Sequence, residues 1–444
     1  ADADLWINPG AAPEADLLAL KVFGCEGSTG TDVILDALEA AVFMDADVVN
    51  MSLGSPFGEA AGPEQDAIHE LTSFWDILVV VSAGNSGHNP YLVGTSSTAP
   101  DALSVAAADA WTQFPGSQLE IDGDFYYAQI SNGVDLGDLN DQEPYEIFVI
   151  DNGGEIGLGC DEADYDGADG KVVIALRGDC PRVDRALLGE AAGAVAVILV
   201  NNNWDNTDAY PPFEGDISYE NGELVTIPFF GVPSGLYDEM NNADGGDFYV
   251  EDWGFGLDNP NAVGAADFTS SGPRSGDAGV KPDLSAPGVG VLSAAVGTGD
   301  GRAMMSGTSM AAPHTAGIAA LVRDFNPQWT AYQVKRALVG TASINADKMD
   351  STVSSRIIGN GMVQAEAAMD AKIALFDPKT GESGVTMGVY EGAPTTLKAV
   401  VAVQPLDNAR RKVSLRVDVN IPGVTATVSP AKFSVLAGPQ NVTV

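Results

Sequence analysis

The sequence predicts an α/β protein whose core is a parallel β-sheet flanked by helices. Two valine-rich runs, 48–51 and 77–81, end in small and polar residues, as buried strands do where they reach the carboxyl edge of a parallel sheet. An alanine-rich stretch, 309–321, follows a glycine and predicts a helix. Ligands of open α/β sheets bind at the carboxyl ends of the strands, so a site is expected where these runs end.

The most specific motif is the run 306–317, Ser-Gly-Thr-Ser-Met-Ala-Ala-Pro-His-Thr-Ala-Gly. Gly307 lets the backbone turn sharply, and Ser309 then lies at a helix N-terminus, where free N–H groups would stabilise an oxyanion. Pro313 is expected in the first turn, where it costs no interior hydrogen bond. The run resembles the nucleophile motif of the subtilisin-like serine peptidases, which implies that Ser309 is the catalytic serine. The alternative is a serine that only caps a buried helix.

The polar end of the second strand supports this resemblance. Residues 82–87 are Ser-Ala-Gly-Asn-Ser-Gly, and Asn85 matches the side-chain oxyanion donor of the family. Taken alone, Asn85 would be explained as a turn residue between two glycines. In the family the same segment forms one wall of the primary specificity pocket, which implies substrate-binding roles for Ser82, Ala83 and Gly84.

The end of the first strand resembles the family segment that pairs with an extended substrate. The substrate is added there as a further strand, so backbone hydrogen bonds give affinity without fixing its sequence. The resemblance assigns this role to Ser52, Leu53 and Gly54. The ordinary geometry of a sheet edge is the structural alternative for both segments.

The general base and its orienting carboxylate are missing from the expected motifs. The mechanism needs a histidine to take the hydroxyl proton and an acid to orient it, and subtilisin orders them Asp, His, Ser. None of the three histidines lies in a His-Gly-Thr-His type helix. His69 falls in a predicted amphipathic helix at 64–74, His88 in a loop, and His314 in the serine motif, where the family has a non-catalytic histidine.

The first segment that resembles the family is 10–23, which includes a predicted strand at Leu17–Phe23. In the family this segment follows the histidine helix, and the sequence begins without Met. We therefore expect a fragment that starts after the catalytic Asp and His. The alternative is a catalytically inactive subtilase-like protein that acts as a protein-binding module.

The resemblance to the peptidase breaks after residue 110 and resumes near residue 261. The centre of this insertion predicts a strand from residue 171 that ends in a glycine turn, a helix at 183–193, a second strand at 195–201 and a fourth element at 225–232. With Arg-Gly-Asp-Cys at 177–180, it resembles a protease-associated (PA) domain, an insert of large subtilisin-like peptidases. This resemblance implies a gate for substrates or partners and no catalytic group.

Two cysteines and an acidic loop mark the same insertion. Cys160 and Cys180 flank the stretch 161–170. In a secreted protein they would form a disulfide, and Cys25 would have no partner within this sequence. The stretch holds five carboxylates, so it is either a solvated loop or an oxygen-rich calcium site, although it lacks the alternation of an EF-hand. The predicted chemistry requires no cofactor, and a structural calcium ion is the one metal left open.

Composition limits the partners and the compartment. The chain has 62 acidic and 21 basic residues and a net charge of −41, which repels nucleic acid and anionic membranes. The sequence contains no run of 18 apolar residues, so it predicts no membrane span. The acidity fits a secreted protein, free or associated with the cell wall, either adapted to high salt or simply acidic at its surface.

The sequence therefore predicts four parts. A subtilisin-like peptidase domain occupies 1–115 and 262–378, the insertion with the PA-like domain occupies 116–261, and a truncated β domain occupies 384–444. The last part alternates apolar and polar residues between turns, as a fibronectin-type or immunoglobulin-like β-sandwich does. The predicted function is a secreted serine endopeptidase that hydrolyses peptide bonds of proteins or peptides through an acyl-enzyme on Ser309.

Overall fold

The computed structural model of the 444-residue chain forms two compact units. Unit 1 consists of Ala1–Ala110, Val263–Val289 and Ser306–Val444, and unit 2 of Trp111–Ala262 and Gly290–Met305. Each unit has a hydrophobic core of its own. The structure describes residues 9–25, 27–132, 136–140, 143–202, 219–220, 223–259, 262–297, 299, 301–344, 354–386, 396–407, 409–417, 419, 423–436 and 438–444.

A parallel sheet of four strands, in the order β1-β2-β3-β13, forms the core of unit 1. Its strands are β1 (Val48–Met51), β2 (Leu78–Ser82), β3 (Leu103–Ala108) and β13 (Leu284–Pro287). The helices that pack on it are α1 (Thr31–Phe43), α2 (Pro63–Ser73), α5 (Thr308–Phe325) and α6 (Ala331–Thr341). The predicted α/β class, with a parallel sheet flanked by helices, is confirmed.

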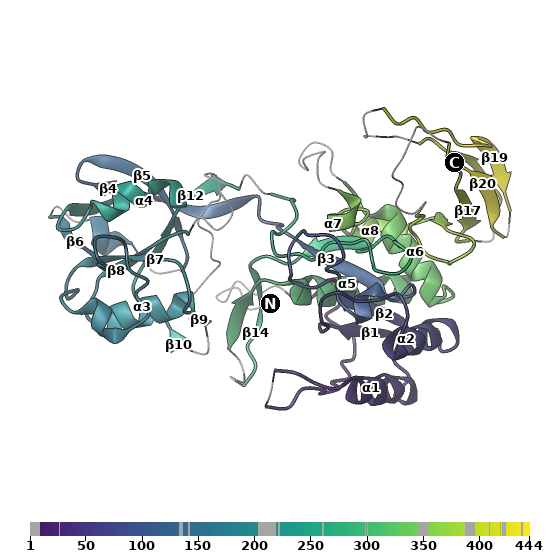
Figure 1. Cartoon of the computed structure of the whole chain (residues 1–444), viewed down its shortest axis with the longest axis horizontal. Helices are drawn as coiled ribbons and strands as arrows, with labels where there is room; N and C mark the ends of the chain where they lie inside the picture. Colours follow the sequence, from purple (N-terminus) through teal and green to yellow (C-terminus); the bar gives the residue numbers. More distant parts are fainter. Residues whose placement is uncertain are drawn as a thin grey trace. The chain divides into compact units, whose positions relative to one another are not determined.

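Both faces of this sheet are covered by helices, which explains why β2 is apolar from Leu78 to Val81, before it ends in Ser82. Val79 and Val81 pack into a cluster with α1 and α2, whereas Leu78 and Val80 pack into a cluster with α5 and α6 (Figure 1). Side chains of a strand alternate between the two faces, so a strand covered on both sides needs an apolar residue at every position.

The strand predicted at Leu17–Phe23 is wrong. Residues 15–24 carry no strand, and the side chain of Leu17 is 92% exposed. A β-strand is stabilised by a neighbouring strand that receives and donates its backbone hydrogen bonds. In the described part of the chain, no strand pairs with this segment.

The position expected for Pro313 is also wrong. Because α5 begins at Thr308, Pro313 is its sixth residue and lies beyond the first turn. Proline has no N–H, so the carbonyl four residues earlier, that of Ser309, loses its usual helical donor.

The remainder of unit 1 contains short helices and antiparallel strands. The helices are α7 (Ser355–Ile358) and α8 (Ala365–Met369). The strands form one sheet of β16 (Ile373–Phe376), β17 (Val400–Pro405) and β20 (Gln440–Thr443), and a second of β18 (Arg411–Ser414) and β19 (Lys432–Val435). Val403, Val413, Val435 and Val442 form the small core between these strands.

Unit 2 is built on a closed barrel of seven strands in the order β11-β5-β4-β12-β6-β7-β8. Their bounds are β4 (Gln113–Ile121), β5 (Asp124–Ile130), β6 (Tyr145–Val149), β7 (Val172–Leu176), β8 (Ala196–Val200), β11 (Phe229–Val232) and β12 (Asp247–Asp258). Helix α3 (Arg182–Ala191) packs against the barrel. The two strands and the helix predicted at the centre of the insertion are confirmed as β7, β8 and α3, and the fourth element, at 225–232, contains the strand β11.

Smaller elements complete unit 2. They are η2 (Gly137–Asn140), η3 (Glu162–Tyr165), η4 (Ser234–Leu236), α4 (Tyr237–Asn241), β9 (Tyr219–Glu220), β10 (Glu223–Leu224), β14 (Val291–Ala294) and β15 (Arg302–Met305). A disulfide joins Cys160 to Cys180, and Cys25 of unit 1 is exposed and unpaired. In neither unit does the structure describe a helix that is both long and apolar enough to cross a membrane.

Candidate active site

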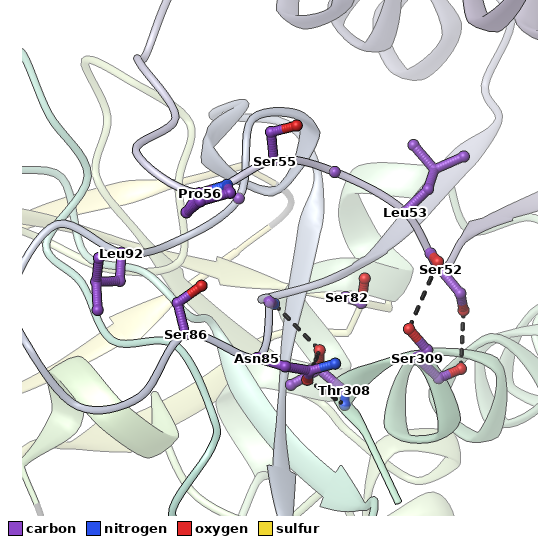
Figure 2. Close-up of a pocket in the computed structure, with 13 residues that line it drawn as sticks. Ser52, Leu53, Ser55, Pro56, Ser82, Asn85, Ser86, Leu92, Thr308 and Ser309 are labelled. Atoms are coloured by element: carbon purple, nitrogen blue, oxygen red, sulfur yellow. Dashed lines mark hydrogen bonds between the residues drawn. The ribbon is translucent and has the colours of Figure 1, made fainter. Parts of the chain in front are cut away.

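The carboxyl ends of β1 and β2 and the N-terminus of α5 surround a cavity of about 260 Å³ (Figure 2). This is the sheet edge at which the sequence predicts a site. The cavity is lined by Ser52, Leu53, Gly54, Ser55, Pro56, Ser82, Gly84, Asn85, Ser86, Leu92, Gly94, Thr308 and Ser309. Of the predicted site residues in unit 1, Ala83 alone does not line it, because its side chain is fully buried.

Ser309 is the second residue of α5 and is half-buried at the cavity wall. Its hydroxyl donates a long hydrogen bond of 3.5 Å to the carbonyl oxygen of Ser52. Its backbone N–H has no hydrogen-bond partner among the described residues. The N-terminus of a helix offers such free N–H groups together with a partial positive charge, so this end of α5 favours an anion beside Ser309.

Asn85 follows β2 and is held by Thr308. The side-chain carbonyl of Asn85 accepts hydrogen bonds from the backbone N–H of Thr308 at 3.0 Å and from its hydroxyl at 2.8 Å. The amide nitrogen of Asn85 is therefore the end left to donate, and Figure 2 shows this side chain extending toward Ser309. Amide orientation is fixed by such partners, and here both partners are donors.

Gly307 lies beside this amide. Its φ of 164° is extended backbone that any residue adopts, so the predicted sharp turn is not what requires glycine. A Cβ at this position would lie 3.5 Å from Nδ2 of Asn85, in ordinary van der Waals contact with the amide.

Ser270 and Thr308, for which the sequence predicts no role of their own, shape the same wall. The hydroxyl of Ser270 accepts a hydrogen bond from the backbone N–H of Ser86 at 3.0 Å. Gly84 has a φ of +107°, and a Cβ on it would approach Ser270 Oγ to 2.8 Å. Thr308 accepts from the N–H of Gly84 at 3.1 Å. Thr308 lies inside the serine motif and was within reach of sequence reasoning, whereas Ser270 is distant in sequence and carries no motif of its own.

The two segments predicted to bind substrate form opposite sides of the cavity. The backbone of the segment 94–95 connects them, because Gly94 donates to the carbonyl of Ala83 at 2.9 Å and Thr95 donates to that of Ser55 at 2.8 Å. The lining contains no Asp, Glu, His, Lys or Arg side chain. The cavity is therefore suited to an uncharged group.

Two of the three histidines have partners other than Ser309. His69 on α2 bonds Asp101 through Nδ1 at 2.6 Å, and His88 bonds the carbonyl of Ala266 through Nε2 at 3.0 Å. Burial lowers the pKa of His314 below its usual value, which favours its neutral form. In the described part of the chain, no histidine hydrogen-bonds to Ser309.

The carboxylates of the acidic loop in unit 2, residues 161–170, are not arranged to hold a metal ion. Asp161 and Asp164 cap η3 reciprocally, each side chain accepting from the backbone N–H of the other. Among the residues that the structure describes, no three His, Cys, Asp or Glu side chains are arranged to hold a metal ion.

Comparison with known proteins identifies the family. The model of the subtilase family (Peptidase_S8) matches residues 4–361. The chain is 29% identical to the minor extracellular protease Vpr of Bacillus subtilis (strain 168), over 94% of this chain and 50% of Vpr. It is 31% identical to the PII-type proteinase of Lacticaseibacillus paracasei, over 82% of this chain and 21% of that proteinase.

A solved structure, of the psychrophilic subtilisin-like protease Apa1 from Pseudoalteromonas sp. AS-11, matches 79% of this chain and 76% of its own chain. Its sequence identity to this chain is 19% and the TM-score is 0.36. The chain spans half the length of Vpr and about a fifth of the PII-type proteinase. Because the family model matches most of the sequence and the serine motif lies within the match, the chain belongs to the subtilase family.

Proposed function

We propose that the whole protein is a secreted serine endopeptidase that hydrolyses peptide bonds through an acyl-enzyme on Ser309. The observation that carries the proposal is the convergence of three groups on one cavity. These are the Ser309 hydroxyl, the free N–H of Ser309 at the start of α5, and the amide of Asn85, turned by Thr308. Two donors beside a nucleophile form an oxyanion hole.

In this mechanism the oxygen of Ser309 attacks the scissile carbonyl carbon, and its proton passes to a base. The carbonyl oxygen becomes an oxyanion, which the N–H of Ser309 and the amide of Asn85 stabilise. The tetrahedral intermediate collapses, the peptide C–N bond breaks, and the base gives its proton to the leaving amine. Water then hydrolyses the ester by the same steps.

We further propose that segments 52–54 and 82–84 bind an extended substrate and that the cavity takes an uncharged side chain. The absence of ionisable groups from the cavity lining supports the second point. We assign unit 2 to a PA-like gate for large substrates and residues 384–444 to a fibronectin-type domain. Secretion is supported by the similarity to Vpr, which is named an extracellular protease, and by the net charge of −41.

A second function, a catalytically inactive protein-binding module, is favoured by one observation. Each of His69 and His88 is bonded elsewhere, and His314 is half-buried within the helix that carries Ser309. A serine without a base is a poor nucleophile near neutral pH.

Cleavage of a denatured protein and of short peptides by the whole protein separates the two functions. The enzyme is expected to release fragments, and Ser309→Ala should reduce turnover by a factor on the order of 10⁶, the loss measured when the serine of subtilisin is removed. Ser73→Ala is the matched control, since its hydroxyl donates to a helix carbonyl on α2, away from the cavity. Binding of the protein substrate without any cleavage would support the inactive module.

A further inference from the structure

We propose that Ser52 is a positioning residue for the nucleophile because it supplies the hydrogen bond that Pro313 cannot. The proposal rests on the proposed function for its effect on turnover. Its structural part, the pairing of Ser52 with Ser309, rests on the hydrogen bonds between the two residues.

The carbonyl of Ser309 lacks its helical donor. In an α-helix this carbonyl would accept from the N–H four residues later, and that residue is Pro313. The proline ring also crowds the carbonyl four residues before it. A buried or half-buried carbonyl without a donor costs free energy, so a replacement donor is expected near Ser309.

Ser52 is that donor. Its hydroxyl donates to the carbonyl oxygen of Ser309 at 2.8 Å, and it accepts in turn from the side-chain amide of Asn50 at 3.2 Å. The hydroxyl of Ser309 closes the contact from the other side through its long bond to the carbonyl of Ser52. Figure 2 shows both bonds between the two serines.

This contact fixes the start of α5 against the end of β1. Ser52 directly follows β1, a rigid strand of the parallel sheet, and Ser309 is in the first turn of α5. The first turn would otherwise be free to shift where Pro313 interrupts the hydrogen-bond ladder. Because attack on a carbonyl depends on the placement of the nucleophile to within about an ångström, a shift of Ser309 would lower the rate of acylation.

The test is a double-mutant cycle in the whole protein with Ser52→Ala, Pro313→Ala and the double variant. With Pro313 present, Ser52→Ala should lower kcat about tenfold and change KM less than about twofold, since the defect lies in the position of the nucleophile. In the Pro313→Ala background, the new N–H can bond the carbonyl of Ser309, and Ser52→Ala should then lower kcat less than about twofold. Ser73→Ala serves again as the control.

The midpoint of urea unfolding, measured on the same four proteins, separates this proposal from the proposed function. If the parent protein shows no serine-dependent cleavage but Ser52→Ala lowers the midpoint only in the Pro313 background, the peptidase assignment fails and the pairing stands. Equal losses of kcat and of the midpoint in both backgrounds would overturn the proposal, because Ser52 would then act independently of Pro313. A rise in KM without a fall in kcat would also overturn it and leave Ser52 as a substrate contact.

Discussion

Thr308 holds the side-chain carbonyl of Asn85 with two hydrogen bonds, one from its backbone N–H at 3.0 Å and one from its hydroxyl at 2.8 Å. The residue before the nucleophile thereby orients the amide that would meet the oxyanion. An asparagine amide has two ends of opposite character, and only one orientation places a donor in the cavity. The two halves of the proposed oxyanion hole are therefore connected through Thr308.

Removal of the Thr308 hydroxyl tests this connection. Thr308→Val keeps the shape of the side chain and the backbone N–H but loses one of the two bonds to Asn85 and the acceptor for Gly84. We expect kcat to fall about tenfold with little change in KM, because a poorly oriented Asn85 amide stabilises the oxyanion of the transition state less well. Thr308→Ser restores the hydroxyl and should return most of the rate. If Thr308→Val and Thr308→Ser are equally slow, packing rather than hydrogen bonding accounts for the role of Thr308.

Asn85→Ala removes the side-chain donor itself. Steady-state kinetics on a short peptide should show kcat lowered about 10²–10³-fold, the loss measured when one such donor is removed from subtilisin. KM should change far less, since the oxyanion exists only near the transition state. An effect confined to KM would assign Asn85 to substrate binding or to the turn after β2.

The disulfide of unit 2 should stabilise that unit without assisting catalysis. Cys160 and Cys180 are separated by 20 positions, and closing a loop of that size contributes roughly 3 kcal/mol through the unfolded state. Replacing both cysteines by serine should lower the melting temperature of unit 2 and alter the cleavage of large proteins. Hydrolysis of a short peptide should be unchanged, and its loss would mean that unit 2 supports the active site.

Asp283 should make the stability of unit 1 sensitive to acid. Burial alone would raise the pKa of this carboxyl, but Lys281, bonded to it at 2.7 Å, and Lys335 together lower the pKa below its ordinary value. The folded state then binds fewer protons than the unfolded state in the window below the ordinary carboxyl pKa. The stabilisation is therefore complete above that window and is lost as pH falls through it.

Urea unfolding at a series of pH values between 2 and 7 measures this effect. Asp283→Asn leaves the two lysines buried without a carboxylate, so the free energy of unfolding should fall by about 3–5 kcal/mol at pH 7. The variant should also lose most of the decline at acid pH that Asp283 causes. Asp370→Asn, which removes an exposed carboxylate, is the control. An unchanged decline in Asp283→Asn would show that other carboxyls control acid unfolding.

The fold around the serine motif was predictable because each element carries its own signal. The strand β2 is apolar from Leu78 to Val81 and ends in Ser82, which lines the cavity, and α5 follows a glycine. The central strands and helix of unit 2 were predictable for the same reason, since their hydrophobic periodicity is local. The strand predicted at Leu17–Phe23 failed because a β-strand depends on a partner, and its own residues do not reveal whether one is present.

The contacts that orient the site were not predictable from local patterns. Ser270 and Ser52 act through hydrogen bonds to residues far away in the sequence, and no spacing rule connects them. Pro313 was misplaced because the start of α5 was not fixed to the residue, and one turn decides whether a proline is harmless or removes a hydrogen bond. The replacement donor for the Ser309 carbonyl, the hydroxyl of Ser52, became visible only in three dimensions.

Labelling of the whole protein with a serine-directed fluorophosphonate tests the central claim most directly. The reagent forms a stable bond with a serine oxygen that is activated by a base and faces an oxyanion hole. We expect mass spectrometry of a digest to find the label on Ser309, and we expect Asn85→Ala to slow the labelling. A protein that is folded but unlabelled, or labelled equally fast after Ser309→Ala, would contradict the assignment of Ser309 as the nucleophile.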